Sequence, residues 1–178
     1  MPRATLGFLD VVLARRSVRQ FLAKPVDDLT LRKILEAANR APSAGNLQAY
    51  QVYVVKDGGL RRRLDAASGS QGPVLQAPVV LVFCAVPLRS AARYGVKGEQ
   101  LFCVQDATIA CAYAQLAATA LGLASVWIGA LHESEVVRDT LYLDDGLWPV
   151  AFLPIGYPAE IPPPTPRRPL SDIVRELT

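Results

Sequence analysis

The sequence predicts a mixed α/β fold, and two patterns carry that prediction. Apolar residues recur at helical spacing in several segments, whereas residues 79–86 are almost wholly apolar, as in a strand buried on both faces. The length of 178 residues suits one domain, and neither an internal repeat nor a linker divides the chain. We therefore expect a single domain over residues 1–178.

The N-terminal elements are two helices. In the first, around residues 9–13, the apolar side chains share one face. The second begins at the potential N-caps Asp27 and Asp28, and its apolar residues from Leu31 to Ala38 follow the i, i+3, i+4, i+7 pattern. Pro42 ends that helix, because the position before a proline disfavours helical backbone.

The middle of the chain alternates between strands and helices. A strand over residues 50–55 ends at a glycine turn, and a short helix over residues 60–67 follows it. The apolar strand over residues 79–86 comes next. Residues 89–100 contain two glycines and several charges, so we expect an irregular segment that could cover a site.

The C-terminal elements begin with an alanine-rich helix over residues 103–121 that is apolar nearly all round. Such a helix has no solvent face, so we expect it in the core or against another subunit. Gly122 is its expected C-terminal cap. Strands over residues 125–131 and 150–156 follow, with a helix over residues 133–141 between them.

Composition excludes several functional classes. The net charge of +3 comes from 19 basic and 16 acidic residues, which gives no support for nucleic-acid binding. Polar residues interrupt the apolar stretch 103–123, which favours a buried helix over a membrane span, and no signal peptide is recognisable. Cys84, Cys103 and Cys111 have neither metal-type spacing nor an even number. We expect a cytoplasmic protein without a metal site.

The arginine segment, Arg15-Arg16-Ser17-Val18-Arg19, directly follows the first helix and suits a phosphate dianion. Guanidinium groups bind phosphate oxygens through paired N–H bonds, and a serine hydroxyl adds a further contact. Alternate residues of an extended segment point the same way, so Arg15, Ser17 and Arg19 would share one side and Arg16 would face the other. The alternative is a solvated helix terminus whose arginines complement the helix dipole.

The amide loop, Pro42-Ser43-Ala44-Gly45-Asn46-Leu47-Gln48, follows the second helix. Such residues commonly end helices, so a plain connector is the alternative interpretation. Asn46 and Gln48 each carry a donor and an acceptor, which matches the mixed polar edge of a flavin pyrimidine ring.

Two weaker signals lie further along the chain. Gly129, after Ile128 in a predicted strand, would let a flat ring approach the backbone. Arg167 and Arg168, in the proline-rich and extended tail over residues 158–169, could close over a phosphate. The alternatives are a close strand–helix contact and a surface turn.

Together these four elements resemble the FMN-dependent nitroreductase superfamily over about residues 13–174. The resemblance implies an α+β fold, a nitroreductase-like sandwich with a mainly antiparallel central sheet flanked by helices. It also implies an intertwined homodimer with FMN in clefts between the subunits. The candidate cofactor-binding residues are Arg15, Arg16, Ser17, Arg19, Pro42, Ser43, Asn46, Gln48, Ile128, Gly129, Arg167 and Arg168.

The resemblance also assigns roles to these residues. The arginine segment would hold the phosphate-ribityl part and the adjacent ring edge, with Arg167 or Arg168 completing the phosphate site. The amide loop would come from the opposite subunit, and Ile128-Gly129 would line the ring. The chain departs from the family at Ala49 and Tyr50, where a proline, often followed by tryptophan, is usual.

The implied activity is that of an oxidoreductase. NAD(P)H would reduce FMN, and a small organic acceptor such as a nitroaromatic or a quinone would then be reduced by a ping-pong mechanism. The flavin supplies the chemistry, so no catalytic side chain is required, and the single histidine, His132, is expected to be a loop residue. Motifs of Rossmann, P-loop, α/β-hydrolase and HExxH enzymes do not occur.

Two alternatives remain open at this point. One is a same-fold specialist for reductive dehalogenation, enoate reduction or flavin breakdown. The other is a flavin-binding protein without catalytic turnover.

Overall fold

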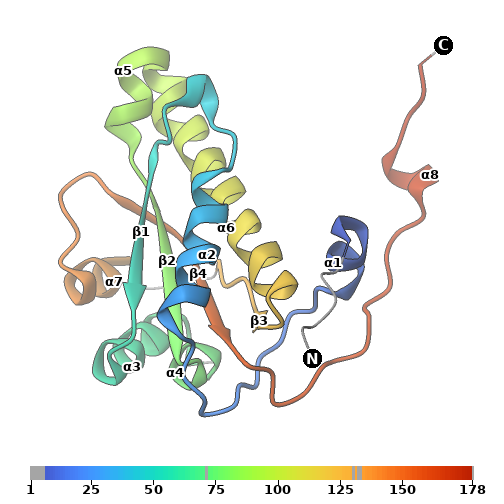
Figure 1. Ribbon diagram of the computed structural model, residues 1–178. Helices are drawn as coiled ribbons and strands as arrows, with labels where there is room; N and C mark the ends of the chain where they lie inside the picture. Colours follow the sequence, from blue (N-terminus) through green and yellow to red (C-terminus); the bar gives the residue numbers. More distant parts are fainter. Residues whose placement is uncertain (1–6, 71, 130, 132–133, 178) are drawn as a thin grey trace.

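An antiparallel sheet lies at the centre of the molecule (Figure 1). The computed structural model describes residues 7–70, 72–129, 131 and 134–177. Within these residues the strand order is β1-β2-β4-β3, and every neighbouring pair is antiparallel, as the predicted fold class requires. The strands are β1 (Tyr50–Val55), β2 (Val79–Ala85), β3 (Ala124–Ser125) and β4 (Trp148–Gly156).

Helices cover both faces of this sheet. On one face α2 (Asp28–Asn39) packs against α6 (Cys103–Ala120), and on the other lie α3 (Gly58–Ala67) and α7 (Ser134–Leu141). The shorter and peripheral helices are α1 (Phe8–Ala14), η1 (Ala44–Asn46), α4 (Pro73–Gln76), α5 (Pro87–Lys97), η2 (Gly98–Phe102) and α8 (Leu170–Ile173).

Strand β2 divides the core in two. All seven of its residues are buried. Leu81 and Phe83 contribute to the cluster that α2 and α6 share, whereas Val80 and Val82 contribute to the cluster under α3 and α7. Successive strand side chains point to opposite faces, so an apolar run of this kind belongs to a strand covered on both sides. The prediction of a central buried strand is confirmed.

The predicted ends of two helices are confirmed by their capping bonds. Asp27 caps α2, because its carboxylate accepts a hydrogen bond of 2.8 Å from the backbone N–H of Thr30. Gly122 follows α6 with φ of +77°. The N–H groups of Gly122 and Leu123 donate to the carbonyls of Thr119 and Ala118, which is a Schellman motif.

The strand predicted over residues 125–131 is shorter than expected. Regular pairing stops at Ser125, and Ile128 makes only an isolated bridge to Phe152. The register that pairs Ala124 with Gly156 and Ile128 with Phe152 places Val126 opposite Pro154. Proline has no N–H, so the ladder loses a hydrogen bond at that pair.

The prediction of an irregular segment over residues 89–100 is wrong. This segment is helical, in α5 and η2. Its two glycines have different roles: Gly95 interrupts the helix, whereas Gly98 allows a close packing contact. Gly95 takes φ of +57° at a kink, and a Cβ on Gly98 would lie 2.5 Å from the carbonyl oxygen of Ser90. Two close helical turns therefore require glycine where the sequence suggested a loop.

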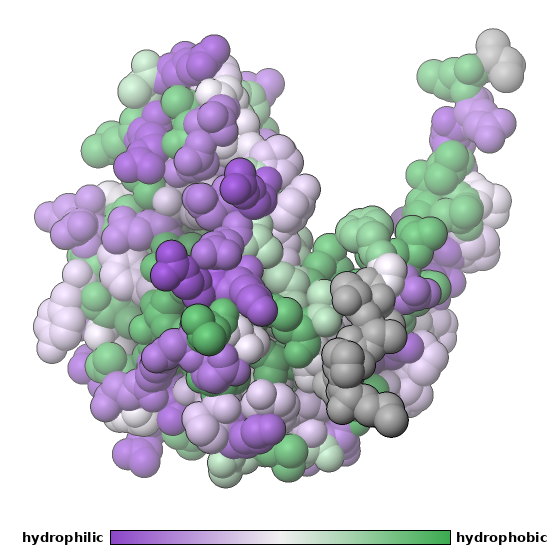
Figure 2. Space-filling view, viewed as in Figure 1, coloured by the Kyte–Doolittle hydropathy of each residue, from purple (hydrophilic) through white to green (hydrophobic). Residues whose placement is uncertain are grey.

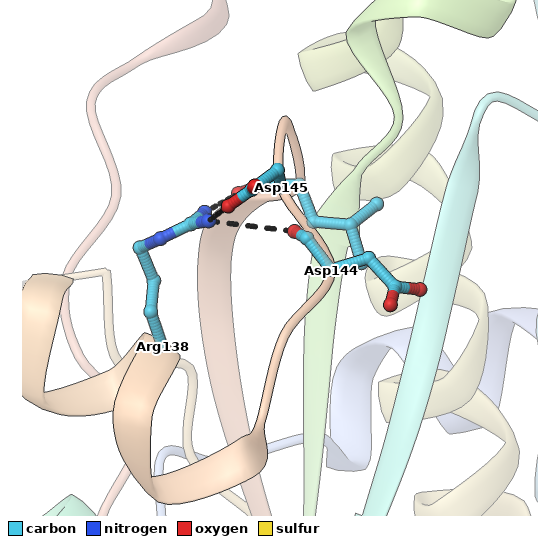
Figure 3. A network of polar contacts seen from close by, with 4 residues as sticks. Arg138, Asp144 and Asp145 are labelled. Carbon is cyan, nitrogen blue, oxygen red and sulfur yellow. Dashed lines mark hydrogen bonds and ion pairs between the residues drawn. The ribbon is translucent and has the colours of Figure 1, made fainter.

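The turn between α7 and β4 is fastened by one arginine (Figure 3). The guanidinium of Arg138 donates to the Leu147 carbonyl at 2.6 Å and to the Asp144 carbonyl at 3.4 Å, and it pairs with the Asp145 carboxylate at 3.5 Å. These bonds fix the chain where it enters β4. His132, predicted as a loop residue, and Glu133, the predicted start of α7, lie outside the described residues.

The continuous helical stretch Pro87–Ala120 is long and apolar enough to cross a membrane by length and composition alone. The core helix of a folded globular protein passes the same test. Its inner face, which includes Ala107, Ala110 and Ala114, is buried against the sheet and α2, whereas Tyr113 on the outer face is exposed. We therefore interpret this stretch as a core helix with one face that the described residues leave uncovered.

Candidate cofactor site

The arginine segment is held in extended form at the edge of the sheet. Ser17 forms a parallel bridge with Ser125 of β3, and the Val18 N–H donates to the Ser125 carbonyl at 3.1 Å. Val18 is 2% exposed, whereas the flanking Ser17 is half-buried and Arg19 is exposed. The predicted alternation of the segment is therefore present in the structure.

Arg15 and Arg167 are near enough for their charges to interact, although 151 residues separate them in the chain (positions 16 to 166). Partial burial lowers the pKa of Arg15, and the positive charges of Arg167 and Arg16 lower it further. In the described part of the chain neither Arg15 nor Arg167 pairs with a carboxylate. Like charges gathered without a counter-ion favour an anionic ligand at this place. Arg168 is exposed and makes no comparable contribution to the pKa of Arg15.

The guanidinium of Arg16 turns back onto α1. It donates to the carbonyls of Leu13 and Arg15, the latter at 2.9 Å, so it caps carbonyl groups at the end of the helix. Arg19 also reaches its own segment, with a bond of 3.4 Å to the Ser17 carbonyl. The two arginines thus differ. The guanidinium of Arg16 is bonded to carbonyls at the end of α1, whereas that of Arg19 makes only one long, exposed hydrogen bond.

The amide loop is fixed by a network of its own side chains. The Ser43 hydroxyl accepts a bond of 3.0 Å from the Gln48 N–H, and Gln48 Nε2 donates to both Oδ1 and the carbonyl of Asn46 at 2.8 Å. Gly45, Asn46 and Gln48 all have positive φ, between +47° and +58°. Such backbone is rare outside glycine and is often found at functional sites. Pro42 is exposed at the entry to the loop.

Asp106 of α6 is a supporting residue that the sequence analysis did not identify. Its buried carboxylate accepts hydrogen bonds from the N–H groups of Ala44, at 2.9 Å, and Ala49, at 3.2 Å, so it grips the amide loop at two points. The signal was present as a lone carboxylate in an apolar helix. A buried charge of this kind requires partners, and here they are backbone donors.

The departure from the family pattern at Ala49 has a structural role. Proline lacks the N–H that Ala49 donates to Asp106. The neighbouring Tyr50 hydroxyl donates to the Ala38 carbonyl at 3.2 Å and so joins the loop to the end of α2. Burial and the charge of Asp106 raise the pKa of Tyr50, which keeps this hydroxyl protonated.

Within one chain the arginine segment and the amide loop lie at opposite ends of α6 (Figure 1). The amide loop is bonded to Asp106, near the start of the helix, and the arginine segment is bonded to Ser125, beyond its end. At 1.5 Å per residue, the helix between Asp106 and Ala120 separates them by roughly 20 Å. The structure does not bring the two motifs together within a single chain.

At Ile128 and Gly129 only backbone atoms are available to a ligand, because the Ile128 side chain is buried and Gly129 has none. The Ile128 side chain is buried in the core, and its N–H and carbonyl both pair with Phe152, at 3.0 and 2.9 Å. Gly129 is exposed, and a Cβ there would meet Trp127 Nε1 at 3.3 Å. The backbone of Gly129 therefore stays open to a flat ligand, while the Ile128 donor is already used.

A groove of about 1010 Å³ lies between the segment that follows α1, the end of α6 and the start of the C-terminal tail, and Figure 2 shows the molecule hollowed beside the arm that α1 and the tail form. The groove is lined by α1, the end of α6 and the start of the tail, including Ala14, Leu121 and Ile161. Large apolar side chains of the arm stand in solvent, with Leu9 and Leu170 each 72% exposed. Exposed apolar surface of this extent is typical of an interaction surface.

The cysteines are buried and unpaired. Burial raises the pKa of Cys84 to about 12 and also raises the pKa values of Cys103 and Cys111, so these thiols stay protonated near neutral pH. In the residues that the structure describes, no three histidine, cysteine, aspartate or glutamate side chains gather to hold a metal ion.

Comparison with known proteins defines the family. The model of the Nitroreductase family matches residues 12–85 and 65–157. The "NADH dehydrogenase" of Thermus thermophilus is 36% identical over 200 residues, with 96% of this chain and 98% of the relative covered. The "Oxygen-insensitive NADPH nitroreductase" of Salmonella typhimurium is 32% identical, covering 94% and 72%. The "FMN reductase [NAD(P)H]" of Bacillus subtilis is also 32% identical, covering 92% and 70%.

Solved structures agree with this assignment. NfrA2 of B. megaterium superimposes with a TM-score of 0.90 at 29% identity, covering 96% of this chain and 74% of that one. The NADPH:FMN oxidoreductase of Vibrio harveyi, solved with NAD⁺, gives 0.87 at 30% identity, covering 96% and 77%. The chain belongs to the nitroreductase family and has its fold.

Proposed function

We propose that this chain is an FMN-dependent NAD(P)H oxidoreductase, formed by a single domain over residues 1–178, that reduces a small organic acceptor. The names of its relatives support this activity, since they include an NADPH nitroreductase and an FMN reductase. One observation in the structure carries the proposal furthest: Arg15 is partly buried beside Arg167, without a carboxylate among the described residues.

The phosphate end of FMN fits the arginine segment. Arg15 and Ser17 are alternate residues of the extended segment that bridges to Ser125, and Arg167 adds a second cation from the tail. A phosphate dianion there would relieve the repulsion between the guanidinium groups. We assign Arg167 to this site in preference to Arg168, and we assign Arg16 to the end of α1. Arg19 would place positive charge near the ring nitrogen N1, where reduction builds up negative charge.

The ring of FMN fits the remaining elements. Asn46 and Gln48 are fixed before any ligand arrives, so their amides can pair with the pyrimidine edge at little entropic cost. The N–H of Ile128 is bonded to Phe152, which leaves the Gly129 N–H as the donor for flavin N5. When bound, the flavin supplies hydride and electron transfer between NAD(P)H and the acceptor. The residues named here bind and orient it.

A homodimer completes the site in this proposal. The arginine segment and the amide loop of one chain lie roughly 20 Å apart along α6. A second copy seated in the groove would bring its amide loop to the arginine segment of the first. The exposed apolar side chains of α1 and the tail, and the uncovered face of α6, would supply the interface. In this proposal FMN binding requires the dimer, because neither chain holds a whole site, and the apolar helix after Cys103 makes the dimer obligate.

A same-fold specialist and a non-catalytic binder are the competing functions. The relatives named as reductases favour turnover over mere binding. We also propose a cytoplasmic location, with which three buried, unpaired cysteines are compatible.

The visible absorption spectrum of the purified protein, before and after anaerobic addition of NADH or NADPH, tests the proposal. We expect a two-banded flavin spectrum that bleaches, and we expect recovery of the bands on addition of a quinone or a nitroarene. A spectrum that persists with both donors would contradict the reductase and favour a binder. A colourless protein that cannot be reconstituted with FMN would contradict the cofactor itself.

A further inference from the structure

We propose that the basic cluster, Arg89 and Arg93 of α5 together with Lys97 at its end, binds the anionic group of the molecule that exchanges electrons with the flavin. This inference rests on the proposed function and names the substrate class. The three side chains are exposed and spaced four residues apart. Arg89 and Arg93 thus lie one turn above the other, on the same side of the helix.

Two members of the basic cluster are anchored at the amide loop. The Arg89 guanidinium donates to the Gln48 carbonyl at 3.3 Å, and the Arg93 guanidinium donates to the Gly45 carbonyl at 3.4 Å. Each guanidinium uses one donor group in this contact and keeps others for a ligand. The cations therefore border the loop whose amides are proposed to hold the ring edge of FMN.

Two aromatic rings contact the side chains of Arg93 and Lys97 in the basic cluster. Tyr94 and Phe102 meet edge to face, with ring centroids 5.1 Å apart. Arg93 lies over the Tyr94 ring and Lys97 over the Phe102 ring, each at 5.5 Å from the centroid. The kink at Gly95 turns the chain between these two pairs, so Lys97 and Arg93 flank one aromatic pair. Cation–π contacts of this kind hold long side chains without neutralising their charge.

The charge of the basic cluster is not compensated within the described residues, since none of its members forms an ion pair with a carboxylate there. The end of the molecule around α5 carries hydrophilic residues among apolar ones (Figure 2). Unpaired cations next to a redox site attract anionic partners and raise their local concentration. Two sources carry such a group: the 2′-phosphate that distinguishes NADPH from NADH, and an anionic substituent on an aromatic acceptor.

The test measures dissociation constants on the purified, oxidised protein by calorimetry, so it does not depend on turnover. The probes are two pairs that differ in one anionic group: adenosine 2′,5′-bisphosphate with adenosine 5′-monophosphate, and a naphthoquinone sulfonate with the neutral naphthoquinone. The variant is Arg93→Gln/Lys97→Gln. Its matched control is Arg62→Gln/Arg63→Gln, which removes two exposed charges from α3 at the other end of the sheet (Figure 1).

We expect the Arg93→Gln/Lys97→Gln variant to weaken binding of one probe at least about fivefold relative to its counterpart that lacks the extra anionic group, with the effect falling in high salt. The control should keep the wild-type ratio. A loss confined to the bisphosphate identifies the NADPH phosphate, and a loss confined to the sulfonate identifies the acceptor. Equal weakening of both members of each pair, or no change in either pair, would overturn the inference. Failure of NAD(P)H to bleach the flavin would instead count against the proposed function.

Discussion

The arginine segment and the amide loop both follow a helix, but the chain fixes them by different means. The amide loop is held by bonds among its own side chains and by the buried Asp106, which accepts from the backbone at either end of the loop. The arginine segment is held through its backbone, by one bridge to Ser125, while its guanidinium groups lack carboxylate partners among the described residues. A neutral heterocycle edge needs donors and acceptors placed in advance, whereas a dianion can order flexible cations as it binds.

The largest effect is expected at the arginine segment. We predict that Arg15→Ala weakens FMN binding by about 2–5 kcal/mol, because truncating one partner of a partly buried charge pair leaves the other uncompensated. Fluorescence titration of the apoprotein with FMN measures the change. Arg168→Ala is the matched control and should have a much smaller effect, since the neighbouring charge that acts on Arg15 is that of Arg167. Equal effects of the two substitutions would remove the assignment of the phosphate site.

A substitution at Asp106 tests how the amide loop is held. We predict that Asp106→Asn lowers the free energy of unfolding by about 1.5–3 kcal/mol, since an amide cannot accept well from two backbone donors and brings an N–H₂ group toward them. Urea denaturation measures this change, with Asp139→Asn on the exposed part of α7 as control. Unchanged stability in Asp106→Asn would mean that the amide loop does not depend on this carboxylate.

Replacing Gly45 of the amide loop, and Gly146 as a comparison, distinguishes the cost of a steric clash from the cost of backbone strain. A Cβ at this position would lie 2.5 Å from the Tyr94 hydroxyl, on a residue with φ of +57°. Gly146 has a φ of +87° with nothing within 4 Å of a Cβ, so Gly146→Ala reports the backbone cost alone. We predict a cost of about 1–2 kcal/mol for Gly146→Ala and a larger one for Gly45→Ala. Equal unfolding free energies for the two variants would show that α5 does not press on the loop.

The smallest effect concerns pH. Burial raises the pKa of Cys84 to about 12. The thiol of an unfolded chain titrates near about 8.5, so the folded protein holds this proton more tightly. The resulting stability is fully present below about pH 8.5 and is lost as the pH rises toward 12, by at most about 1.4 kcal/mol per pH unit. Urea midpoints from pH 7 to 9, over which this contribution falls by less than about 1 kcal/mol, should fall less steeply in Cys84→Ala than in the wild type. Identical slopes would show that this thiol does not govern alkaline stability.

The sequence predicted the elements whose cause is local. The N-cap at Asp27, the buried run of β2 and the glycine after α6 are short-range signals, and each was found where expected. The length of the strand predicted over residues 125–131 was overestimated, because Pro154 on the neighbouring strand ends the regular pairing. The prediction for residues 89–100 was wrong for a similar reason. Gly95 allows a kink, and Gly98 allows a close approach to the backbone of Ser90, which only the folded chain brings near.

In the candidate site, too, local features could be predicted from the sequence and long-range contacts could not. The sequence identified Ser43, Asn46 and Gln48 as candidate cofactor-binding residues, but the bonds among them were not predicted. The support from Asp106 could not be predicted either, because Asp106 and Ala49 are 57 positions apart and only the packing of α6 brings them together. The choice between Arg167 and Arg168 likewise required the path of the tail beside Arg15.

The central claim is that one complete site needs the arginine segment of one chain and the amide loop of another. Two differently tagged chains, Arg15→Ala and Asn46→Ala/Gln48→Ala, can be expressed together and the mixed dimer purified through both tags. Absorbance then gives the FMN bound per dimer, with the two pure variants as controls that should each hold little. The account predicts one FMN per mixed dimer, since one site receives both intact motifs. A mixed dimer as empty as the pure variants would show that each site is built within a single chain.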